Sequence, residues 1–476
     1  MSIVQKVVKN TNAILWGEII SRVISALAIL YLASYLGINL FGRYSFVIVY
    51  IGIFAIVCDV GIDSILVREI SKNFVDPGKG IGNALLMKLI IATIGIITSN
   101  FLVIIFSFPS QIIHGVLALS IILIPISLGS TFTTILQVNL VMKYSAFANV
   151  VEKIIFSVFI VFIILMERGL FLVFTVTSLS AWASFILKMK YSMRYAIPNF
   201  ERDFSYWKKL FIWALPIGIV FIAGTIVTHI GVIFLSVMVG DADAGYYYAA
   251  RVLIVPIYLI SYAFIISVYP LMSHSWENSK ANFTLIFDSS IRVMTAIGLP
   301  LAICVSLLSD KIIDFFYPNE YSSAGIALAL LIWAEAFLFV NSVCAYALYS
   351  AGKQRLVALY SIFAVVLVLI LNILLIPSLG LEGSCLAKIG SEVFSLIAGY
   401  SLVAKYLKTR ANIGNILKII GLAFLLGALL ERFLKYQSSI IAALIGTLSY
   451  VAVYFFLIFH FKLFGDIKIA NLFGKI

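Results

Sequence analysis

Ionisable side chains inside long apolar runs are the residues of this sequence that are most suited to a chemical function. Because a charge in hydrocarbon costs several kcal/mol, such a residue is a functional candidate that faces the interior of a helix bundle. Guanidinium and ammonium groups bind anionic groups such as phosphate, so a cleft lined by several of them would attract an anionic ligand. Seven basic residues lie within the apolar runs: Arg22, Lys88, Lys153, Arg251, Arg292, Lys388 and Lys418.

Four of these cations are predicted to line a central cavity. Lys88 and Arg292 lie 204 residues apart, and each precedes a similar sequence segment, Ala92-Thr-Ile-Gly95 and Thr295-Ala-Ile-Gly298. For both, the alternative is a long side chain that reaches the cytoplasmic interface, and for Arg251 the same alternative applies at the outer interface. Arg22 follows Glu18 by four residues on one helix face, so the two can form an ion pair that only locks the first helix to a neighbour.

Buried carboxylates are candidates for binding a coupling proton or cation. Asp59 lies deep in the second predicted helix and Glu335 near the middle of the tenth, and Glu18 belongs to the pair with Arg22. Metal is not expected, because the four cysteines have spacings that suit no zinc site: they are Cys58, Cys304, Cys344 and Cys385. We therefore expect no metal and no disulfide. We also assign no catalytic residue and no cofactor.

Composition defines the kind of chain that must position these groups. The 476 residues are 63% hydrophobic and 11% charged, with a mean hydropathy of +1.13, far from the average soluble domain. Apolar runs of about 20 residues, each long enough to span a bilayer, predict an all-α polytopic membrane protein with about fourteen transmembrane helices. The net charge of +12 comes from basic residues scattered over loops and helix ends, so we expect no nucleic-acid partner.

An internal repeat organises the runs. Gly37, Gly42 and Tyr44 recur 203 residues later as Gly240, Gly245 and Tyr247, and each set lies between two long apolar runs. The glycines are predicted to permit a tight reversal with positive φ, and the tyrosines to lie at a membrane boundary. The offset of 203 residues relates the start of the first predicted helix to the start of the seventh, so both halves begin on the same side of the membrane. The two halves are therefore predicted to be parallel repeats.

The repeat and the polar intervals predict the domain organisation and the topology. We expect an N-terminal six-helix lobe, a cytoplasmic linker, a C-terminal six-helix lobe, and two additional transmembrane helices with a tail. The segments that lie inside in an N-in, C-in topology carry a large excess of Lys and Arg, which places both termini in the cytoplasm. No interval is long enough for a soluble catalytic module, so an enzyme is not expected. The predicted boundaries are 1–193, 194–209, 210–410 and 411–476.

Several segments resemble one family. The sequence is similar, in order, to polysaccharide flippases of the Wzx type in the multidrug/oligosaccharidyl-lipid/polysaccharide exporter superfamily, and the similarity spans nearly the whole chain. The matching segments are Leu36-Gly37, Phe41-Gly42-x-Tyr44-Ser45-Phe46, Asp59-x-Gly61, Arg68-Glu69, Gly245-Tyr246-Tyr247, Ala250-Arg251, Pro256, Tyr269-Pro270 and Gly380-Leu-Glu-Gly383.

The resemblance implies two six-helix lobes in a V around a central cavity, plus two extra helices. It also implies a flippase that moves a polyprenyl-diphosphate-linked oligosaccharide across the cytoplasmic membrane for cell-surface polysaccharide synthesis. Membrane lipids and polysaccharide assembly proteins are the other expected partners. Arg22, Lys88, Arg251 and Arg292 would bind the anionic headgroup, and alternating access would move it without covalent chemistry.

Three alternatives stay open at the level of sequence. A cation-coupled multidrug exporter of the same superfamily usually has twelve helices and an acidic, aromatic cavity. An integral-membrane polysaccharide polymerase or glycosyltransferase would be expected to present a sizeable outer catalytic loop, which the sequence does not show. The third alternative is a structural scaffold for a polysaccharide assembly complex.

Overall fold

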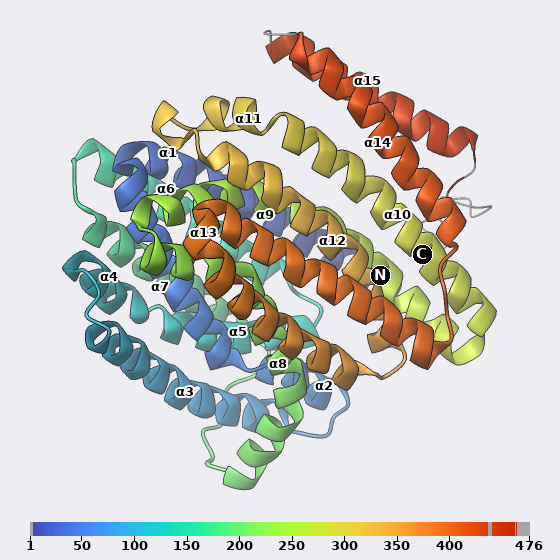
Figure 1. Cartoon of the computed structure of the whole chain (residues 1–476). Coiled ribbons are helices and arrows are strands. Elements are labelled where there is room, and N and C mark those ends of the chain that lie inside the picture. Colours follow the sequence, from blue (N-terminus) through green and yellow to red (C-terminus); the bar gives the residue numbers. More distant parts are fainter. Residues whose placement is uncertain (1–2, 437–439, 462, 464–476) are drawn as a thin grey trace. The chain divides into compact units, whose positions relative to one another are not determined.

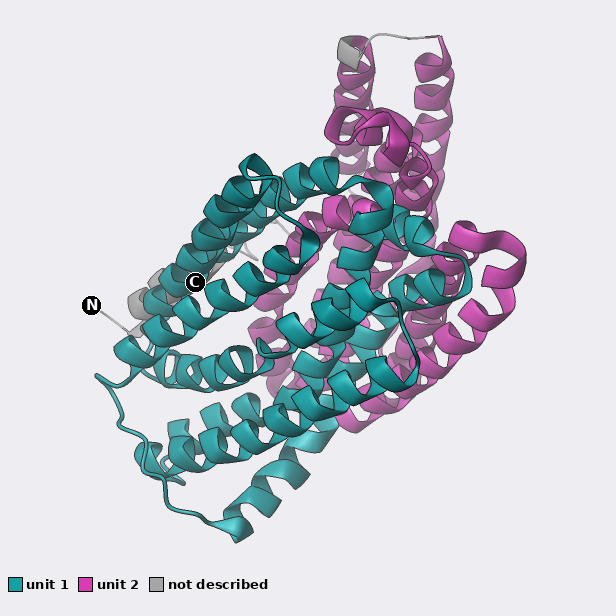
Figure 2. Cartoon of the chain, turned by 90° about the vertical axis from the view of Figure 1, so that its left-hand side faces the viewer, with its two compact units in different colours: residues 1–248 teal, residues 249–476 magenta. Residues whose placement is uncertain are grey.

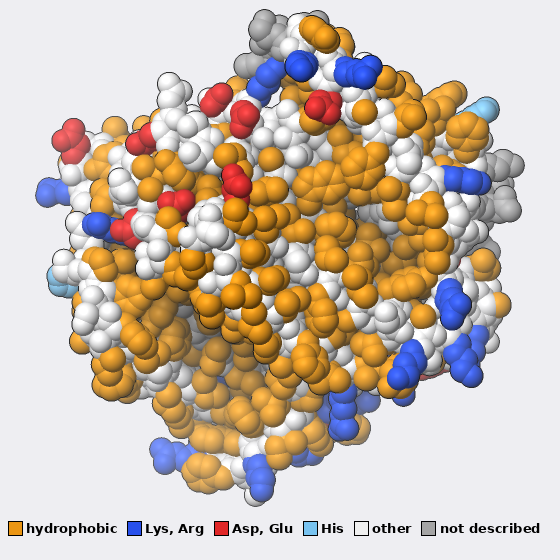
Figure 3. All heavy atoms as spheres, viewed as in Figure 1, with side chains coloured by type: hydrophobic (Ala, Val, Ile, Leu, Met, Phe, Trp, Pro, Cys, Tyr) orange, Lys and Arg blue, Asp and Glu red, His pale blue; other side chains and the backbone are white. Residues whose placement is uncertain are grey.

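The computed structural model describes residues 3–436, 440–461 and 463, and helices are the regular elements of this part of the chain (Figure 1). Twelve of its helices are long and apolar enough to cross a membrane. Hydrophobic side chains cover most of the face shown in Figure 3, as expected of a surface in contact with lipid. The protein is therefore a multi-pass membrane protein.

Two of the twelve helices are between two and three times as long as a membrane requires. Helix α1 (Ile3–Asp59) contains Gly37 at φ 68°, ψ 166°, and α13 (Gln354–Leu402) contains Gly380 at φ 54°, ψ −125°. Both conformations are non-helical and favour glycine. A straight helix of 57 residues would be roughly 85 Å long, almost three times the hydrocarbon thickness. Counted on either side of the two breaks, the described part of the chain has fourteen helical segments of membrane-spanning length, in agreement with the prediction of about fourteen.

The chain divides into two compact units, residues 1–248 and 249–476 (Figure 2). Besides α1, the first unit holds α2 (Ile62–Ser71), α3 (Pro77–Ile105), α4 (Ser110–Ser120), α5 (Leu123–Val138), α6 (Lys143–Leu165), α7 (Leu170–Ser192), α8 (Phe204–Met238) and the start of α9 (Asp241–Asn278). Besides the rest of α9 and α13, the second unit holds α10 (Lys280–Leu307), α11 (Ser309–Phe316), a short 3₁₀ helix (Asn319–Tyr321), α12 (Ala324–Ser350), a π-helical turn (Val403–Leu407), α14 (Ile413–Lys435) and α15 (Ile440–His460).

Helix α8 belongs to the first unit by its packing. Leu210 and Ala214 are buried in one apolar cluster with Ile62 and Ile65 of α2. Gly61, at φ 78°, lies against the backbone of α8, where a Cβ atom would come within 3.0 Å of the Gly218 nitrogen. The division into two six-helix lobes, with a linker at 194–209 and an added pair at 411–476, stays a prediction from the repeat.

The two copies of the repeat, residues 37–44 and 240–247, each form a corner between helical segments, and these two corners pack against each other within the first unit. A Cβ atom on Gly42 would overlap the carbonyl oxygen of Asp241, and a Cβ atom on Gly245 would come within 2.8 Å of the carbonyl oxygen of Ile38. Ile38 and Asp241 occupy the same position of the repeat, so each corner contacts the other through equivalent residues. Such reciprocity is the signature of an interface with two-fold symmetry, and it agrees with the predicted parallel repeat.

The corners also correct two details of the sequence analysis. Only the first glycine of each corner has a positive φ, 68° at Gly37 and 152° at Gly240. Gly42 and Gly245 are helical instead, and they are needed because the two backbones approach so closely. The tyrosines are buried at 2% exposure for Tyr44 and 1% for Tyr247. Tyr44 stacks on Phe41 and Phe174 within the bundle, so it is not a surface anchor.

The segment between α7 and α8 is fastened to the beginning of α3. The Asn83 Oδ1 atom accepts hydrogen bonds from the Asp203 backbone nitrogen at 3.0 Å and from the Trp207 indole nitrogen at 2.7 Å. Asp203 caps α8 by accepting from the Tyr206 backbone nitrogen at 3.0 Å, and it forms an ion pair with Lys79 at 3.3 Å. A side-chain cap and an ion pair thus fix the entry of the chain into α8.

The Asp203 cap predicts a pH-dependent stability. The Tyr206 backbone N–H, and after it the Lys79 ammonium, lower the pKa of Asp203 below its ordinary value. Its ionised form therefore stabilises the folded chain above pH ~4, and this contribution is lost as the pH falls through the lowered pKa. Asp203→Asn keeps a capping oxygen and removes the charge. We expect this variant to have a lower melting temperature than the native chain at neutral pH, and the difference between the two melting temperatures to disappear below pH ~4. A difference that is the same at every pH would contradict this.

Candidate functional site

A buried lysine in the first unit is held by two carboxylates. The Lys88 side chain on α3 is 0% exposed. Its ammonium contacts Asp59 of α1, the Asp63 Oδ2 atom of α2 at 2.7 Å and the Ser130 hydroxyl of α5 at 3.0 Å. Thr131 donates a further hydrogen bond to Asp63 at 3.2 Å. The polar groups that Lys88 needs in a membrane are thus supplied within its own unit.

The break between α1 and α2 places the two carboxylates. Val60 and Gly61 have positive φ values of 46° and 78°, so the helix stops after Asp59 and restarts just before Asp63. Both side chains then reach the same ammonium. Two carboxylates around one cation give the cluster a formal excess of one negative charge, which makes proton uptake by a carboxylate chemically reasonable.

The other predicted charges of the first unit form a helical pair. Arg22 donates from Nε and Nη2 to the Glu18 Oε1 atom, both at 2.8 Å. Their side chains are 28% and 33% exposed, in contrast to the fully buried Lys88. The i, i+4 spacing thus gives the ion pair that it suggested, and part of the Arg22 side chain stays exposed.

Arg292 joins distant segments of the second unit. Its guanidinium pairs with Asp288 one turn earlier on α10 and donates to the carbonyl oxygen of Leu463 at 3.0 Å. Asp288 also accepts from the Asn412 backbone nitrogen, just before α14, at 2.7 Å. The pair therefore fastens α10 to the segments that flank the last two helices. Lys88 and Arg292 lie in different units, and each is neutralised by carboxylates of its own unit.

The remaining predicted residues of the second unit form a charged group. Lys388 and Glu392 pair on α13 with side chains only 7% and 4% exposed. Glu335 on α12 lies within electrostatic range of this pair and of Arg251 on α9. The Glu335 Oε2 atom is buried and has no hydrogen-bond partner. One unpaired carboxylate oxygen in a buried setting marks Glu335 as a group whose protonation can change.

Two site residues were not predicted from the sequence, although each left a signal. Asp63 follows Asp59 by four residues, and Asp288 precedes Arg292 by four. The second spacing is the ordinary spacing of a helical ion pair. In the first case the helix is interrupted, so the spacing alone does not show that both carboxylates meet Lys88.

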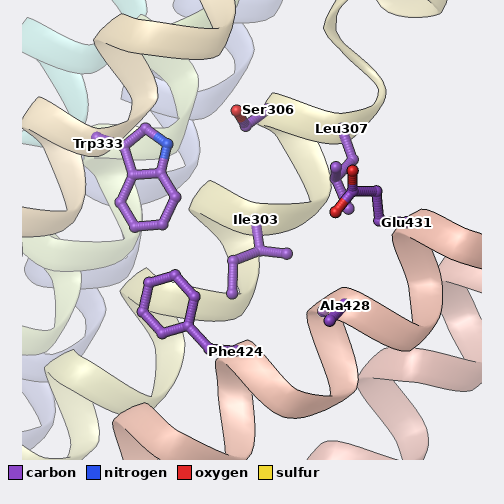
Figure 4. A pocket seen from close by; sticks show the side chains of 8 residues that line it. Ile303, Ser306, Leu307, Trp333, Phe424, Ala428 and Glu431 are labelled. Carbon is purple, nitrogen blue, oxygen red and sulfur yellow. The ribbon is translucent and has the colours of Figure 1, made fainter.

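An apolar pocket in the second unit contrasts with these charged groups (Figure 4). It has a volume of 190 Å³ and lies among α10, α12 and α14. Trp333 and Phe424 stack at its side with ring centroids 5.9 Å apart, and Ile303 and Ala428 add apolar surface. Glu431 is its only ionisable lining residue. The lining therefore offers no cation to a phosphate group.

Solved structures show the fold. The chain matches the lipid II flippase MurJ in an inward closed conformation with a TM-score of 0.77 and 16% identity, over 94% of this chain and 98% of that one. It matches an inward-facing multidrug resistance MATE family transporter of the MOP superfamily with a TM-score of 0.66 and 16% identity, over 82% and 96% of the two chains. The fold is that of the multidrug/oligosaccharidyl-lipid/polysaccharide exporters, as the resemblance implied.

Sequence comparisons show the family. A model described as polysaccharide biosynthesis protein matches residues 7–276, and a model named MatE matches 216–374. The chain belongs to the polysaccharide biosynthesis protein family. It is 23% identical over 399 residues to the probable low-salt glycan biosynthesis flippase Agl15 of Haloferax volcanii. The aligned residues cover 81% of this chain and 80% of that protein. It is 25% identical over 165 residues to the lipid II flippase MurJ of Bacillus subtilis, covering 33% and 30%.

Proposed function

We propose that the protein is a flippase that translocates a polyprenyl-diphosphate-linked oligosaccharide across the cytoplasmic membrane for cell-surface polysaccharide synthesis. The observation that carries the proposal is the match to the polysaccharide biosynthesis family over residues 7–276, joined by a glycan flippase that aligns over 81% of the chain. Such cargo needs a transporter with polar groups in the membrane and no covalent chemistry. The likeness to multidrug transporters reflects the shared fold.

Arg22 is the cation that we assign first to the diphosphate headgroup. Its side chain is 28% exposed and its guanidinium pairs with Glu18 on the same helix, and a phosphate can compete with that carboxylate for the guanidinium donors. Arg251 is kept as a second headgroup residue on the strength of the sequence. Lys88 and Arg292 were predicted for the same role, and we propose instead that they hold helices in place, since their cationic groups are buried against carboxylates.

Glu18, Asp59 and Glu335 are our candidates for coupling to an ion, by alternating access as predicted from the sequence. In this scheme Glu18 competes with the headgroup for Arg22. Asp59 belongs to a cluster with excess negative charge. Glu335 has a buried carboxylate oxygen without a hydrogen-bond partner. We further propose that both termini are cytoplasmic, from the distribution of Lys and Arg, and that polysaccharide assembly proteins act with the flippase.

A matched pair of variants tests the role of Arg22. We expect Arg22→Ala to weaken binding of a polyprenyl-diphosphate lipid about tenfold or more, because a charge-assisted contact with phosphate is lost. Glu18→Gln breaks the same ion pair but leaves the guanidinium available, so binding should be unchanged or tighter. Affinities are measured on purified protein in nanodiscs with folding checked by thermal melting. Equal losses in both variants would show that the pair is only structural.

A further inference from the structure

A polar cavity lies inside the first unit among α2, α5, α6 and α7, whose positions can be followed in Figure 1. Its volume is 380 Å³, within the range of sites that bind small molecules. It is separate from the apolar pocket of Figure 4, which lies in the second unit. None of the four predicted cavity cations lines it, so the headgroup assignments above leave it unused.

The lining offers many neutral hydrogen-bonding groups. Amides come from Gln137 and Asn149, and hydroxyls come from serine and threonine side chains of α5, α6 and α7. Amides and hydroxyls both donate and accept hydrogen bonds. Ser184 is 2% exposed, lines the cavity, and its hydroxyl has no hydrogen-bond partner. A hydroxyl without a partner, in a residue that lines a cavity, has unused hydrogen-bonding capacity beside that cavity.

The charges around the cavity select against a charged ligand. Asp63 is engaged by Lys88 and Thr131, and Glu152 pairs with Lys153 at 2.7 Å. Lys188 adds one cation to the lining. The cluster of Asp59, Asp63 and Lys88 has one negative charge in excess, and Lys188 formally balances it, so neither a diphosphate nor a metal ion finds a surplus of opposite charge. A neutral ligand rich in hydroxyl groups fits amides, hydroxyls and carboxylates that can still accept hydrogen bonds.

The cavity is linked electrostatically to the ion pair that contains the residue proposed for the phosphate. Glu18, the partner of Arg22, lies within electrostatic range of Lys188 in the lining. Phe185 contributes an aromatic ring to the same lining, and such a ring can pack against the apolar face of a sugar ring. Phosphate at Arg22 and saccharide in the cavity would therefore both be bound by the first unit.

We infer that this cavity of the first unit binds a sugar residue of the oligosaccharide headgroup and thereby distinguishes glycosylated from bare polyprenyl diphosphate. The inference rests on the proposed function and adds to it the part of the substrate that this cavity recognises. Recognition of the diphosphate is left to Arg22. The two contributions can be measured separately, because one lipid probe carries both groups and the other carries only the phosphates.

The test uses the full chain in nanodiscs and two probes, polyprenyl diphosphate with an attached oligosaccharide and polyprenyl diphosphate alone. We expect the native chain to bind the glycosylated probe about tenfold more tightly or better. The double variant Asn149→Ala/Ser184→Ala removes two polar groups without adding bulk and should lose most of this preference, with binding of the bare probe unchanged. Ser180→Ala is the matched control, since Ser180 is also 2% exposed and lies one turn away on α7 outside the lining.

The outcomes separate the inference from the proposed function. A double variant that keeps the full preference, or a native chain that has none, would overturn the inference while binding of both probes upholds the function. A native chain that binds neither probe would overturn the proposed function and the inference with it. Thr133→Val, which removes one lining hydroxyl at nearly constant shape, gives the same readout with a smaller loss if the double variant does not fold.

Discussion

Replacing Lys88 with methionine is expected to abolish or severely reduce the recovery of folded protein. The substitution leaves Asp59 and Asp63 without the ammonium that neutralises them. Removing one partner of a buried ion pair costs about 3–5 kcal/mol, because an uncompensated charge stays behind. That is a large part of the stability of an ordinary domain. The measurement is the yield of monodisperse protein from membranes, together with its melting temperature in detergent.

The physical cause can be isolated by removing the orphaned charges as well. In Lys88→Met/Asp59→Asn/Asp63→Asn all three groups are neutral, so most of the lost stability should return. Lys72→Met is the control, because Lys72 is exposed and its loss should change stability by no more than ~0.5 kcal/mol. If Lys88→Met is as stable as the control, or if the triple variant is no better than the single one, the cluster does not hold the helices together.

Gly42→Ala is expected to have the second largest effect. The added methyl group would occupy the place of the Asp241 carbonyl oxygen, and a backbone atom cannot move aside as a flexible side chain can. Overpacking of this kind costs ~1–3 kcal/mol. The same displacement would stretch the ion pair between the Arg43 Nε atom and the Asp241 Oδ2 atom, which are 2.7 Å apart. Gly245→Ala should cost less, since one of its two nearest atoms is the mobile Ile38 Cδ1 atom at 2.8 Å.

Gly52 supplies a control on the same helix. A Cβ atom there would have no heavy atom within 4 Å, so Gly52→Ala should be neutral, or stabilising by ~0.5–1 kcal/mol because alanine favours a helix. Melting temperatures of the three variants in one detergent provide the comparison. If Gly42→Ala has the same melting temperature as Gly52→Ala and the native chain, the close contact of the two corners is contradicted.

The fold was largely predictable because the bilayer fixes it. Runs of about 20 apolar residues must be helices, and this gave fourteen crossings even where Gly37 and Gly380 join two of them without an intervening loop. The repeat was predictable because three spaced residues recur at one offset. What the spacing could not show is that Gly42 is used for close packing and Gly37 for the turn, since this depends on the segment that each meets.

The candidate site was less predictable for a physical reason. A soluble helix shows its buried face by its pattern of polar residues, but a membrane helix is apolar on every side. The sequence therefore identified Lys88 and Arg292 as intramembrane cations without showing which neighbours face them. The Arg22–Glu18 pair was found because both partners lie on one helix. Asp63 was missed as a partner because the helix breaks between it and Asp59.

The most direct test of the account is translocation by the native chain in proteoliposomes. A fluorescent polyprenyl-diphosphate oligosaccharide is placed in one leaflet, and its appearance in the other is followed with a membrane-impermeant quencher. The account predicts rapid exchange of the glycosylated lipid between leaflets, well above that in protein-free vesicles. If the lipid stays in its leaflet while the same preparation exports a cationic dye, the protein is a drug exporter and the flippase assignment is wrong.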